Sequence, residues 1–598
     1  MNPKKTQIWF FSIVLILSTI WLIPFLAEPF VLGAMRETTL EYTWFMLSWI
    51  VFGTLFAISA SIIINLKYKD KVAAFLDRLT LINDARWLFY LCFLALIATA
   101  EIRIFLYHGV SFIDDEFTYK FMAQQLMHGQ LFTLAPKHHE FYSRPFIYVD
   151  EHKMYGGKFS GWPFLLMPFE FLKIDGFANC FYFAFTLPAL YFLLKKYLGN
   201  IWAKLGSVVF LTTPAFFFAA GTYSPHISQI FVTFWSIFFL MKTTEVKSKW
   251  YYHFLFSFFY CLSFFIRPFE GFALLFPMFI FWLWFVCKSK KFFVPVVLCL
   301  VPILFFSSAF MYVNKVQTGS YFTASFLRYF AKEKEKKSIK KYKVTSAQHV
   351  NVRSALDIPV IFINKPSKIM QSVKTTSIGI LRMNSTLFGW PISLLFILFA
   401  YSSEDLLSKF SLFLLLSLSV IFLFQFMEDP DTISKSHHYI FGIPFVILTI
   451  SGVRNLFLQK KYRYKAIILL FIFILMNLCV YSVKRGASLN RFAIDIMQPE
   501  QILKNFNINN AVIFFKSDAG EGSNNIERQI SCSANKNSYH FLFYPLVSYD
   551  PYFKNNVIWV KDLGLVENKK LLQDYPDRKG YLMYWGNQCT PSLTTIKK

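Results

Sequence analysis

Long apolar segments alternate with short polar segments along most of the chain. Because the core of a bilayer is crossed by about 20 apolar residues in a helix, each long apolar segment is a candidate membrane span. We predict about thirteen such helices. They cover roughly residues 8–27, 43–65, 86–107, 177–194, 200–220, 225–241, 251–266, 270–287, 292–313, 388–402, 408–426, 438–454 and 465–482. The pattern therefore predicts a polytopic α-helical membrane protein.

The composition supports this fold class. Of the 598 residues, 55% are hydrophobic and 16% are charged, against about 25% charged in soluble proteins. A disordered chain and a secreted disulfide scaffold are excluded. The net charge is +26, but the basic residues lie in short clusters between apolar runs, so we predict no nucleic-acid partner.

These basic clusters predict the orientation in the membrane. With the spans above, they fall on one side, which the positive-inside rule makes the cytoplasm. The residues are Lys4, Lys5, Lys67, Lys69, Lys71, Arg78, Lys195, Lys196, Lys242, Lys247, Lys249, Lys288, Lys290, Lys291, Arg454, Lys460, Lys461, Arg463 and Lys465. We expect a cytoplasmic N-terminus and a first span that is kept as an anchor.

Three longer polar stretches then lie outside the cytoplasm. They are a first external loop at 108–176, a long loop at 314–387 and a tail at 483–598. The tail contains strand-like runs at 511–515 and 557–560, which predict a small C-terminal α/β domain. We divide the chain into two additional N-terminal helices (1–85), a membrane module (86–482) and this domain.

Two cysteines, Cys532 and Cys589, lie in the external tail. An oxidising compartment permits a disulfide between them, and free thiols are an equal alternative. The other six cysteines lie in or beside predicted spans and are expected to be small apolar residues of the core. No spacing typical of a zinc site is present.

Polar residues gather at the predicted external ends of the spans. The groups are Asp114-Asp115-Glu116, Tyr223–His226, Arg267-Pro268 and Lys435–Tyr439. Ionisable residues near the membrane are costly and often mark a site. Acids, histidines and an arginine at one level predict a pocket for an anionic, partly apolar substrate.

The three acids permit two interpretations. Adjacent carboxylates beside a membrane raise one another's pKa, which suits a general base. Alternatively, they only stabilise the N-terminus of the helix predicted over 117–128, which Gly129 ends. That helix has apolar residues at helical spacing and is expected to lie on the membrane surface.

The other candidates also have structural alternatives. His226 is either a packed polar residue or a lining residue of the pocket. Arg267 either reaches the interface or holds a phosphate. Lys158 is either an exposed loop residue or a phosphate contact, and a metal bound by His437 and His438 is the less favoured interpretation.

The order of these motifs resembles bacterial GT-C membrane glycosyltransferases, which include the family-39 protein O-mannosyltransferases and the lipid A aminoarabinose transferases. The run FIDDEFTYKFMAQQLMHGQLFT is similar to their first external loop and contains Asp115, Glu116 and Tyr119. MYGGKFSGWPF is similar to the next segment and contains Lys158, although the double proline of that segment is absent. The resemblance covers most of 86–598, and His437-His438-Tyr439 stands where relatives often have Gly-x-Arg-Tyr.

The resemblance implies sugar transfer from a polyprenyl-phosphate donor to a lipid, glycan or protein acceptor outside the cytoplasmic membrane of a bacterium. It implies that Asp115 is the general base, supported by Asp114 or Glu116. Donor or acceptor contacts are then expected from Tyr119, Lys158, His226, Arg267, His437, His438 and Tyr439. We predict no metal or other cofactor, although some members of the class use a divalent ion.

Two other functions compete with this one. A lipid or glycolipid transporter would carry ionisable residues near the middle of the membrane, in broken helices. An assembly protein acting through its external tail would have no need of the acidic group. The clustering of charge at one face favours the transferase.

Overall fold

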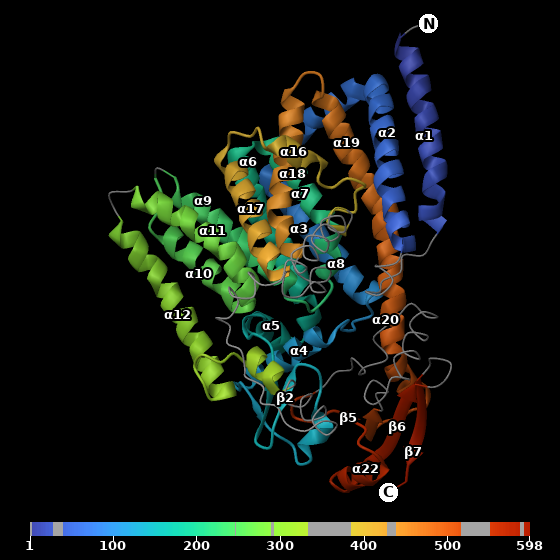
Figure 1. Ribbon diagram of the computed structural model, residues 1–598, viewed down its shortest axis with the longest axis vertical. Coiled ribbons are helices and arrows are strands. Elements are labelled where there is room, and N and C mark those ends of the chain that lie inside the picture. The colour runs from blue at the N-terminus through green and yellow to red at the C-terminus, as the bar shows by residue number, and fades with distance from the viewer. Residues whose placement is uncertain are drawn as a thin grey trace, which may run out of the picture.

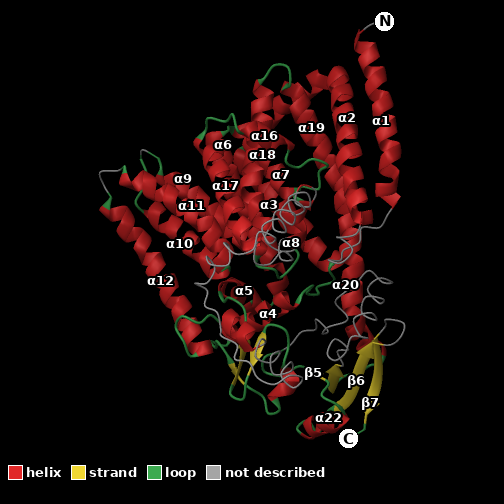
Figure 2. Cartoon of the chain, viewed as in Figure 1, coloured by secondary structure: helices red, strands yellow, loops and turns green. Residues whose placement is uncertain are grey.

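The computed structural model describes residues 3–27, 40–245, 247–288, 292–332, 384, 386–426, 438–515, 550–585 and 591–597. Helices make up most of these residues, and two small sheets lie at one end of the helical bundle (Figures 1 and 2). The N-terminus lies at the opposite end from the sheets (Figure 1).

Most of the predicted spans form helices. The long ones are α1 (Pro3–Ala27), α2 (Leu40–Leu81), α3 (Asp84–Glu101), α6 (Ala178–Tyr197), α9 (His226–Thr243), α10 (Tyr251–Ile266), α11 (Pro268–Cys287), α12 (Phe293–Thr318), α17 (Leu406–Phe426), α18 (Gly442–Leu458), α19 (Arg463–Met476) and α20 (Ser482–Asn505). Short π-helical turns, η1 (Ile102–Leu106) and η6 (Asn477–Tyr481), follow α3 and α19.

The described residues do not reach the predicted count of about thirteen membrane helices. By length and composition, eight helices suffice to cross a membrane, and three shorter apolar ones accompany them. The expected span 200–220 is divided into α7 (Asn200–Leu211) and α8 (Pro214–Ala219), because Pro214 favours an extended Thr213. The expected span 388–402 contains only α16 (Leu395–Ala400), after a turn at Gly389 and Pro391.

The outer helices expose apolar side chains that water would not tolerate in such number. On α12, Phe293, Leu304 and Phe305 are more than half exposed, and Phe89 and Phe93 of α3 are similar. Contiguous apolar surface of this kind is favourable in lipid. The chain is therefore a multi-pass membrane protein.

The centre of the bundle is α18. Nearly every residue of this helix is buried, from Gly442 to Val453. At Gly452 the backbone of Phe396 comes so close that a Cβ atom would lie 1.8 Å from its carbonyl oxygen. A glycine is therefore required where α16 meets α18.

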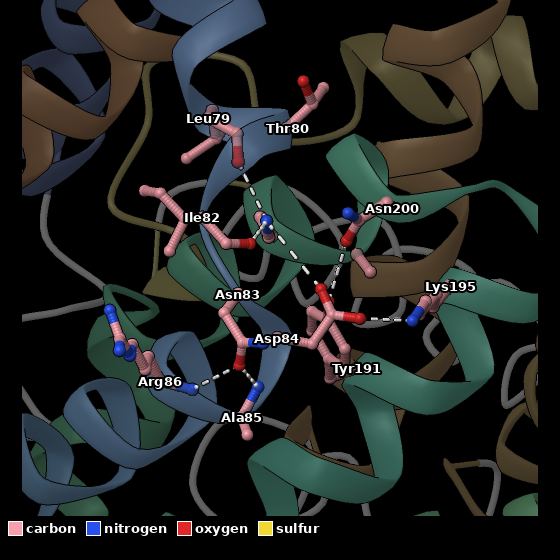
Figure 3. Close-up of polar contacts among 12 residues, drawn as sticks. Leu79, Thr80, Ile82, Asn83, Asp84, Ala85, Arg86, Tyr191, Lys195 and Asn200 are labelled. Carbon is pink, nitrogen blue, oxygen red and sulfur yellow. Dashed lines mark hydrogen bonds and ion pairs between the residues drawn. The ribbon is translucent and has the colours of Figure 1, made fainter.

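A polar cluster fastens the α2–α3 turn to α6 and α7 (Figure 3). The buried Lys204 donates to the carbonyl oxygens of Leu79 at 2.8 Å and Ile82 at 2.6 Å. These carbonyls lie at the end of α2, where helical acceptors lack a partner. Asp84 accepts from Tyr191 at 2.7 Å and pairs with Lys195.

Two sheets lie at the end of the bundle that we predict to be external. The first is antiparallel, in the order β1 (Thr133–Leu134), β3 (Lys153–Gly156), β2 (Ile147–Val149), and it lies beside α4 (Asp114–Met127). The helix α5 (Gly161–Phe171) follows β3 in the chain and packs on α4. The second is formed by β4 (Ala511–Phe515), β5 (Val557–Lys561), β6 (Lys579–Trp585) and β7 (Pro591–Ile596), with α22 (Leu565–Gln573). Its order is β5-β4-β6-β7, and the predicted strands at 511–515 and 557–560 are confirmed.

The two faces of the second sheet pack on different parts of the chain. Ile513 and Trp559 share a cluster with Leu503 of α20. On the other face, Val512 and Phe514 share a cluster with Phe117 and Phe121 of α4, and with side chains of the first external loop. The sheet therefore contributes directly to the core that supports α4. The division of the chain at residue 483 stays a prediction.

Candidate active site

The three predicted acids form the first turn of α4. Ile113, which precedes this turn, makes no side-chain cap, so the acids provide the negative charge that a helix N-terminus favours. The predicted helix over 117–128 is confirmed; it begins at Asp114, and Gly129 follows its end with φ +71°. Its predicted position on the membrane surface is wrong, because Phe117, Phe121 and Met122 are buried inside the protein.

Asp115 and Lys158 form an ion pair with an oxygen–nitrogen distance of 2.8 Å. Lys158 is 7% exposed, whereas the side chain of Asp115 is 33% exposed. Burial lowers the pKa of Lys158, and the charge of Asp115 partly opposes this effect. The carboxylate of Asp115 is therefore accessible to a substrate, and a buried cation lies beside it.

Lys158 rests on aromatic rings. Its ammonium nitrogen lies 3.4 Å from the ring centroid of Phe146 and 5.5 Å from that of Phe326. The carbonyl oxygen of Lys158 accepts from the hydroxyl of Ser325 at 2.9 Å. Such cation–π contacts stabilise an ammonium that has lost part of its water.

The backbone around this lysine is tightly packed. Gly157 donates its N–H to the carbonyl of Phe146 at 2.6 Å, and a Cβ atom on Gly157 would lie 2.8 Å from the Cβ of Tyr329. Phe146 has φ +57°, a conformation that non-glycine residues seldom adopt. Strained backbone of this kind is often found at functional sites.

The surroundings of Asp114 disfavour the charged form of its carboxyl group. Burial, followed by the charge of Asp115, raises its pKa to about 6, while Arg144 and Lys158 oppose the shift. Arg144 is buried, lies 5.0 Å from the ring centroid of Phe117 and donates to the carbonyl of Trp559 at 3.3 Å. Arg144 thus connects the acidic turn with the C-terminal sheet.

Glu116 is bonded to the backbone that precedes α4. Its side chain is buried, and its carboxylate accepts the N–H of Phe112 at 3.1 Å, just before the helix. Burial raises its pKa to about 7, and the charge of Arg103 opposes the shift. These contacts resemble those of a capping box and fit a structural role at the start of α4.

A second set of predicted residues meets where α9, α11 and η5 (His438–Phe441) begin. Nη1 of Arg267 lies 2.6 Å from Nδ1 of His226, and the ring of Tyr439 stacks on His226 at a centroid distance of 4.3 Å. Arg267 also forms an ion pair with the buried Glu270. The guanidinium is thus held between an acid and an imidazole.

The two sets belong to one electrostatic region. The charge of Arg267 contributes to the lowered pKa of Lys158. Tyr119, a buried residue of α4, has a pKa raised by burial and by Asp115, while Arg267 opposes that shift. The structure therefore joins Asp115 to Lys158 and Arg267 to His226 by direct contact, Tyr439 stacks on His226, and the charge of Arg267 reaches Lys158 and Tyr119.

A partly buried polar network includes Lys120 of α4 and supports this helix. Lys120 pairs with Asp175 at 2.9 Å, and the hydroxyl of Tyr223 donates to Asp175 at 2.7 Å. The guanidinium of Arg103 lies 4.4 Å from the ring centroid of Tyr223. These contacts fix the helix that carries the acids.

Sequence reasoning missed several residues of this region, among them Glu270, Phe146, Arg144 and Arg485. Glu270 had a detectable pattern, because it lies three residues after Arg267 on one helix face. Phe146 and Arg144 had none, since only the folded loop brings them to the acids. Arg485 of α20 interacts electrostatically with Tyr107 and Tyr439, and one basic residue among several in a polar helix did not reveal this.

Several predicted residues lie outside the described part of the chain. They are His437, Cys532, Cys589 and most of the loop 314–387, and of His438 only the backbone is described. Among the described residues, no group of three or more His, Cys, Asp or Glu side chains could hold a metal ion.

Comparison with known proteins gives matches only among solved structures. No protein-family model matches the chain. No curated protein matches it either.

The chain resembles solved GT-C glycosyltransferases. ArnT from Cupriavidus metallidurans bound to undecaprenyl phosphate matches with a TM-score of 0.47 and 9% identity, over 86% of this chain and 99% of that chain. The apo state of the same protein matches with a TM-score of 0.42 and 10% identity, over 84% of this chain and 97% of that chain. The oligosaccharyltransferase of Archaeoglobus fulgidus in its apo form matches with a TM-score of 0.37 and 8% identity, over 84% of this chain and 70% of that chain. All three TM-scores are below 0.5, so neither the fold nor the activity of this chain is argued from them.

Proposed function

We propose that this protein is a glycosyltransferase that moves a sugar from a polyprenyl-phosphate donor to an acceptor in a lipid, glycan or protein. The observation that carries the proposal is the accessible carboxylate of Asp115, 2.8 Å from the buried ammonium of Lys158, in the same region as Arg267. A base beside two cations, at one end of a membrane bundle, suits a hydroxylated acceptor and a lipid-phosphate leaving group.

The reaction follows from these charges. The acceptor oxygen forms a bond to the anomeric carbon, and its proton passes to Asp115. The bond between that carbon and the phosphate oxygen breaks, and its electron pair stays on the phosphate. Lys158 and Arg267 stabilise the leaving phosphate, because a guanidinium and an ammonium bind its oxygens strongly. The sugar is either a pentose or a hexose.

The neighbouring side chains have supporting roles in this proposal. Glu270 and His226 hold Arg267, and Tyr439 and Tyr119 line the sugar pocket. Asp114, whose pKa is raised to about 6, supports Asp115 as a second acid. No step requires a metal or another cofactor.

The polyprenyl chain needs an apolar path that begins near Arg267. Phe269, Phe272 and Phe276 lie on one face of α11 at helical spacing and are each more than a third exposed. We place the lipid chain along this face, where the phosphate reaches the start of α11 and the isoprene units contact phenyl rings.

We infer that the active site faces the outside of a bacterial cytoplasmic membrane. The N-terminus lies at one end of the bundle, and α4 with both sheets lies at the other (Figure 1). If the two ends of the bundle correspond to the two sides of the membrane, the N-terminus and the C-terminal sheet lie on opposite sides. The basic clusters assign the N-terminal side to the cytoplasm.

The proposal is tested by mass spectrometry of envelope lipids, glycans and proteins. Three strains are compared: one with the gene, one without it, and one with Asp115→Asn at equal protein level. We expect one sugar to disappear from its acceptor in both defective strains, while the polyprenyl-phosphate sugar accumulates. A sugar retained in the Asp115→Asn strain but lost in the deletion strain would instead support a glycolipid transporter.

A further inference from the structure

The ammonium of Lys158 has capacity for a second partner. It carries three N–H donors, and Asp115 is the ion-pair partner recorded among the described residues. The two rings beside it, Phe146 and Phe326, contact the charge through their π-faces and accept no conventional hydrogen bond. Donors remain available for an anion that enters the site.

The platform beneath the ammonium is fixed. Phe146 is held by the hydrogen bond from Gly157 and by ring contacts with Tyr329 and Phe330, at centroid distances of 5.5 and 6.2 Å. Ser325 holds the backbone carbonyl of Lys158. The remaining freedom lies in the flexible lysine side chain, whose amine can shift across the ring while the backbone stays in place.

The surrounding charges favour a phosphate over a carboxylate as the partner. Arg267 acts on the same region and is itself held by Glu270. Because the charge of Arg267 reaches Lys158, a phosphate beside this ammonium is attracted by two cations, whereas among the described residues the carboxylate of Asp115 forms an ion pair with Lys158 and not with Arg267. The ion pair also occupies a carboxylate oxygen of Asp115, so an incoming acceptor hydroxyl meets an oxygen that already accepts from Lys158.

We propose that Lys158 exchanges partners on the ring of Phe146, from Asp115 in the donor-free protein to the donor phosphate, so that the donor releases Asp115 to take the acceptor proton. This inference rests on the proposed function. Phe146 is then a positioning residue, and the donor binds before the base becomes available. Water and acceptors are not activated in the absence of a donor.

The exchange is tested by binding of undecaprenyl phosphate, without sugar, to the purified full-length protein in detergent. The proteins compared are the wild type, Asp115→Asn, Lys158→Met and the double variant. We expect Asp115→Asn to bind about tenfold more tightly than the wild type, because Lys158 no longer has a competing partner. In the Lys158→Met background, Asp115→Asn should change the affinity little.

A general electrostatic effect gives a different result. If Asp115→Asn tightens binding equally with and without Lys158, or leaves it unchanged, the exchange is contradicted. If Lys158→Met folds poorly, the same four-protein comparison is repeated with Lys158→Gln, which has a polar side chain. If the wild type binds no undecaprenyl phosphate at all, the proposed function fails, and the exchange fails with it.

The role of Phe146 is tested in the same assay. Phe146→Leu keeps an apolar side chain and removes the ring, whereas Phe146→Tyr keeps the ring. We expect Phe146→Leu to weaken binding and to reduce the effect of Asp115→Asn, and Phe146→Tyr to restore both. Equal affinities of Phe146→Leu and Phe146→Tyr for undecaprenyl phosphate would contradict a role of the Phe146 ring in positioning Lys158.

Discussion

At the scale of single residues, the acidic turn contains carboxylates in three different environments. Asp115 is accessible and paired with Lys158, Asp114 is mostly buried beside it, and Glu116 is buried and bonded to the N–H of Phe112. The sequence FIDDEF shows three adjacent acids but not this division, because their orientation depends on where α4 begins and what packs on it.

We predict that Glu116→Gln stabilises the protein at pH 8 and not at pH 5. Burial raises the pKa of Glu116 from 4.5 to about 7, so the folded state binds the proton more tightly than the unfolded state. In the wild type, the ionised Glu116 carboxylate therefore destabilises the folded state. This destabilisation is absent below pH 4.5, grows between pH 4.5 and 7, and reaches about 3 kcal/mol above that range. At high pH the neutral glutamine avoids this penalty.

The measurement is the Tm of the detergent-solubilised protein at both pH values. Glu151→Gln, an exposed acid of the same loop, is the control and should change the Tm at neither pH. An equal decrease in Tm at pH 5 and pH 8 for Glu116→Gln would show that the charged carboxylate, rather than its burial, dominates at this position.

At the scale of elements, the ends of helices determine where charge is placed. The cluster around Lys204 closes the end of α2, and the turn at Asp114 opens α4. One is an internal clamp whose donors and acceptors satisfy one another, and the other leaves a carboxylate accessible. This difference separates a structural cluster from a candidate site.

We predict that Lys204→Met lowers the stability by about 1–3 kcal/mol, because two carbonyl groups lose their donor in a buried position. Lys196→Met is the matched control: this lysine is exposed, and its ion pair with Glu245 at 2.5 Å should contribute at most about 1 kcal/mol. The measurement is the Tm of each variant. Equal Tm values for Lys204→Met and Lys196→Met would contradict a stabilising role of Lys204 at the end of α2.

The apolar pattern predicts most helices because lipid requires a continuous run of apolar residues. It fails where proline and glycine interrupt such a run, at Pro214 and at Gly389 with Pro391. Both interruptions could have been detected in the sequence. The strands β1 to β3 could not, since they are two to four residues long and lack an alternating pattern.

The site was predictable only in part for a similar reason. Asp115, Lys158 and Arg267 were found from their place at the external ends of spans and from the resemblance of the motifs. Their partners Phe146, Arg144 and Glu270 reach them through loop packing and helix starts, which the apolar pattern does not determine.

At the scale of the whole molecule, the C-terminal sheet is part of the support of the site. One face packs on α20, which continues from the membrane helix α19, and the other shares a hydrophobic core with the first external loop and α4. Arg144 connects both, since it lies near Asp114 and donates to Trp559. The tail and the first external loop should therefore act together.

We predict that Phe514→Ala and Ile513→Ala have different effects on activity. Both side chains are fully buried, and truncation of either should cost about 2–5 kcal/mol. Phe514 faces α4 and the first external loop, so its truncation should also lower the rate of sugar transfer. Ile513 faces α20 and should affect stability mainly.

The assay compares initial rates at a temperature well below both Tm values. Equal rates for the two variants would show that the sheet stabilises the protein without positioning α4.

The central claim is that Asp115 takes a proton during transfer of a sugar from a polyprenyl-phosphate donor. The most direct measurement uses purified protein with the lipid-linked sugar that accumulates in the deletion strain, and follows the release of polyprenyl phosphate in a single turnover. The account predicts release with the wild type and a loss of about 100-fold or more with Asp115→Asn, although donor binding is retained. Release at the wild-type rate by Asp115→Asn, with donor and acceptor bound, would contradict it.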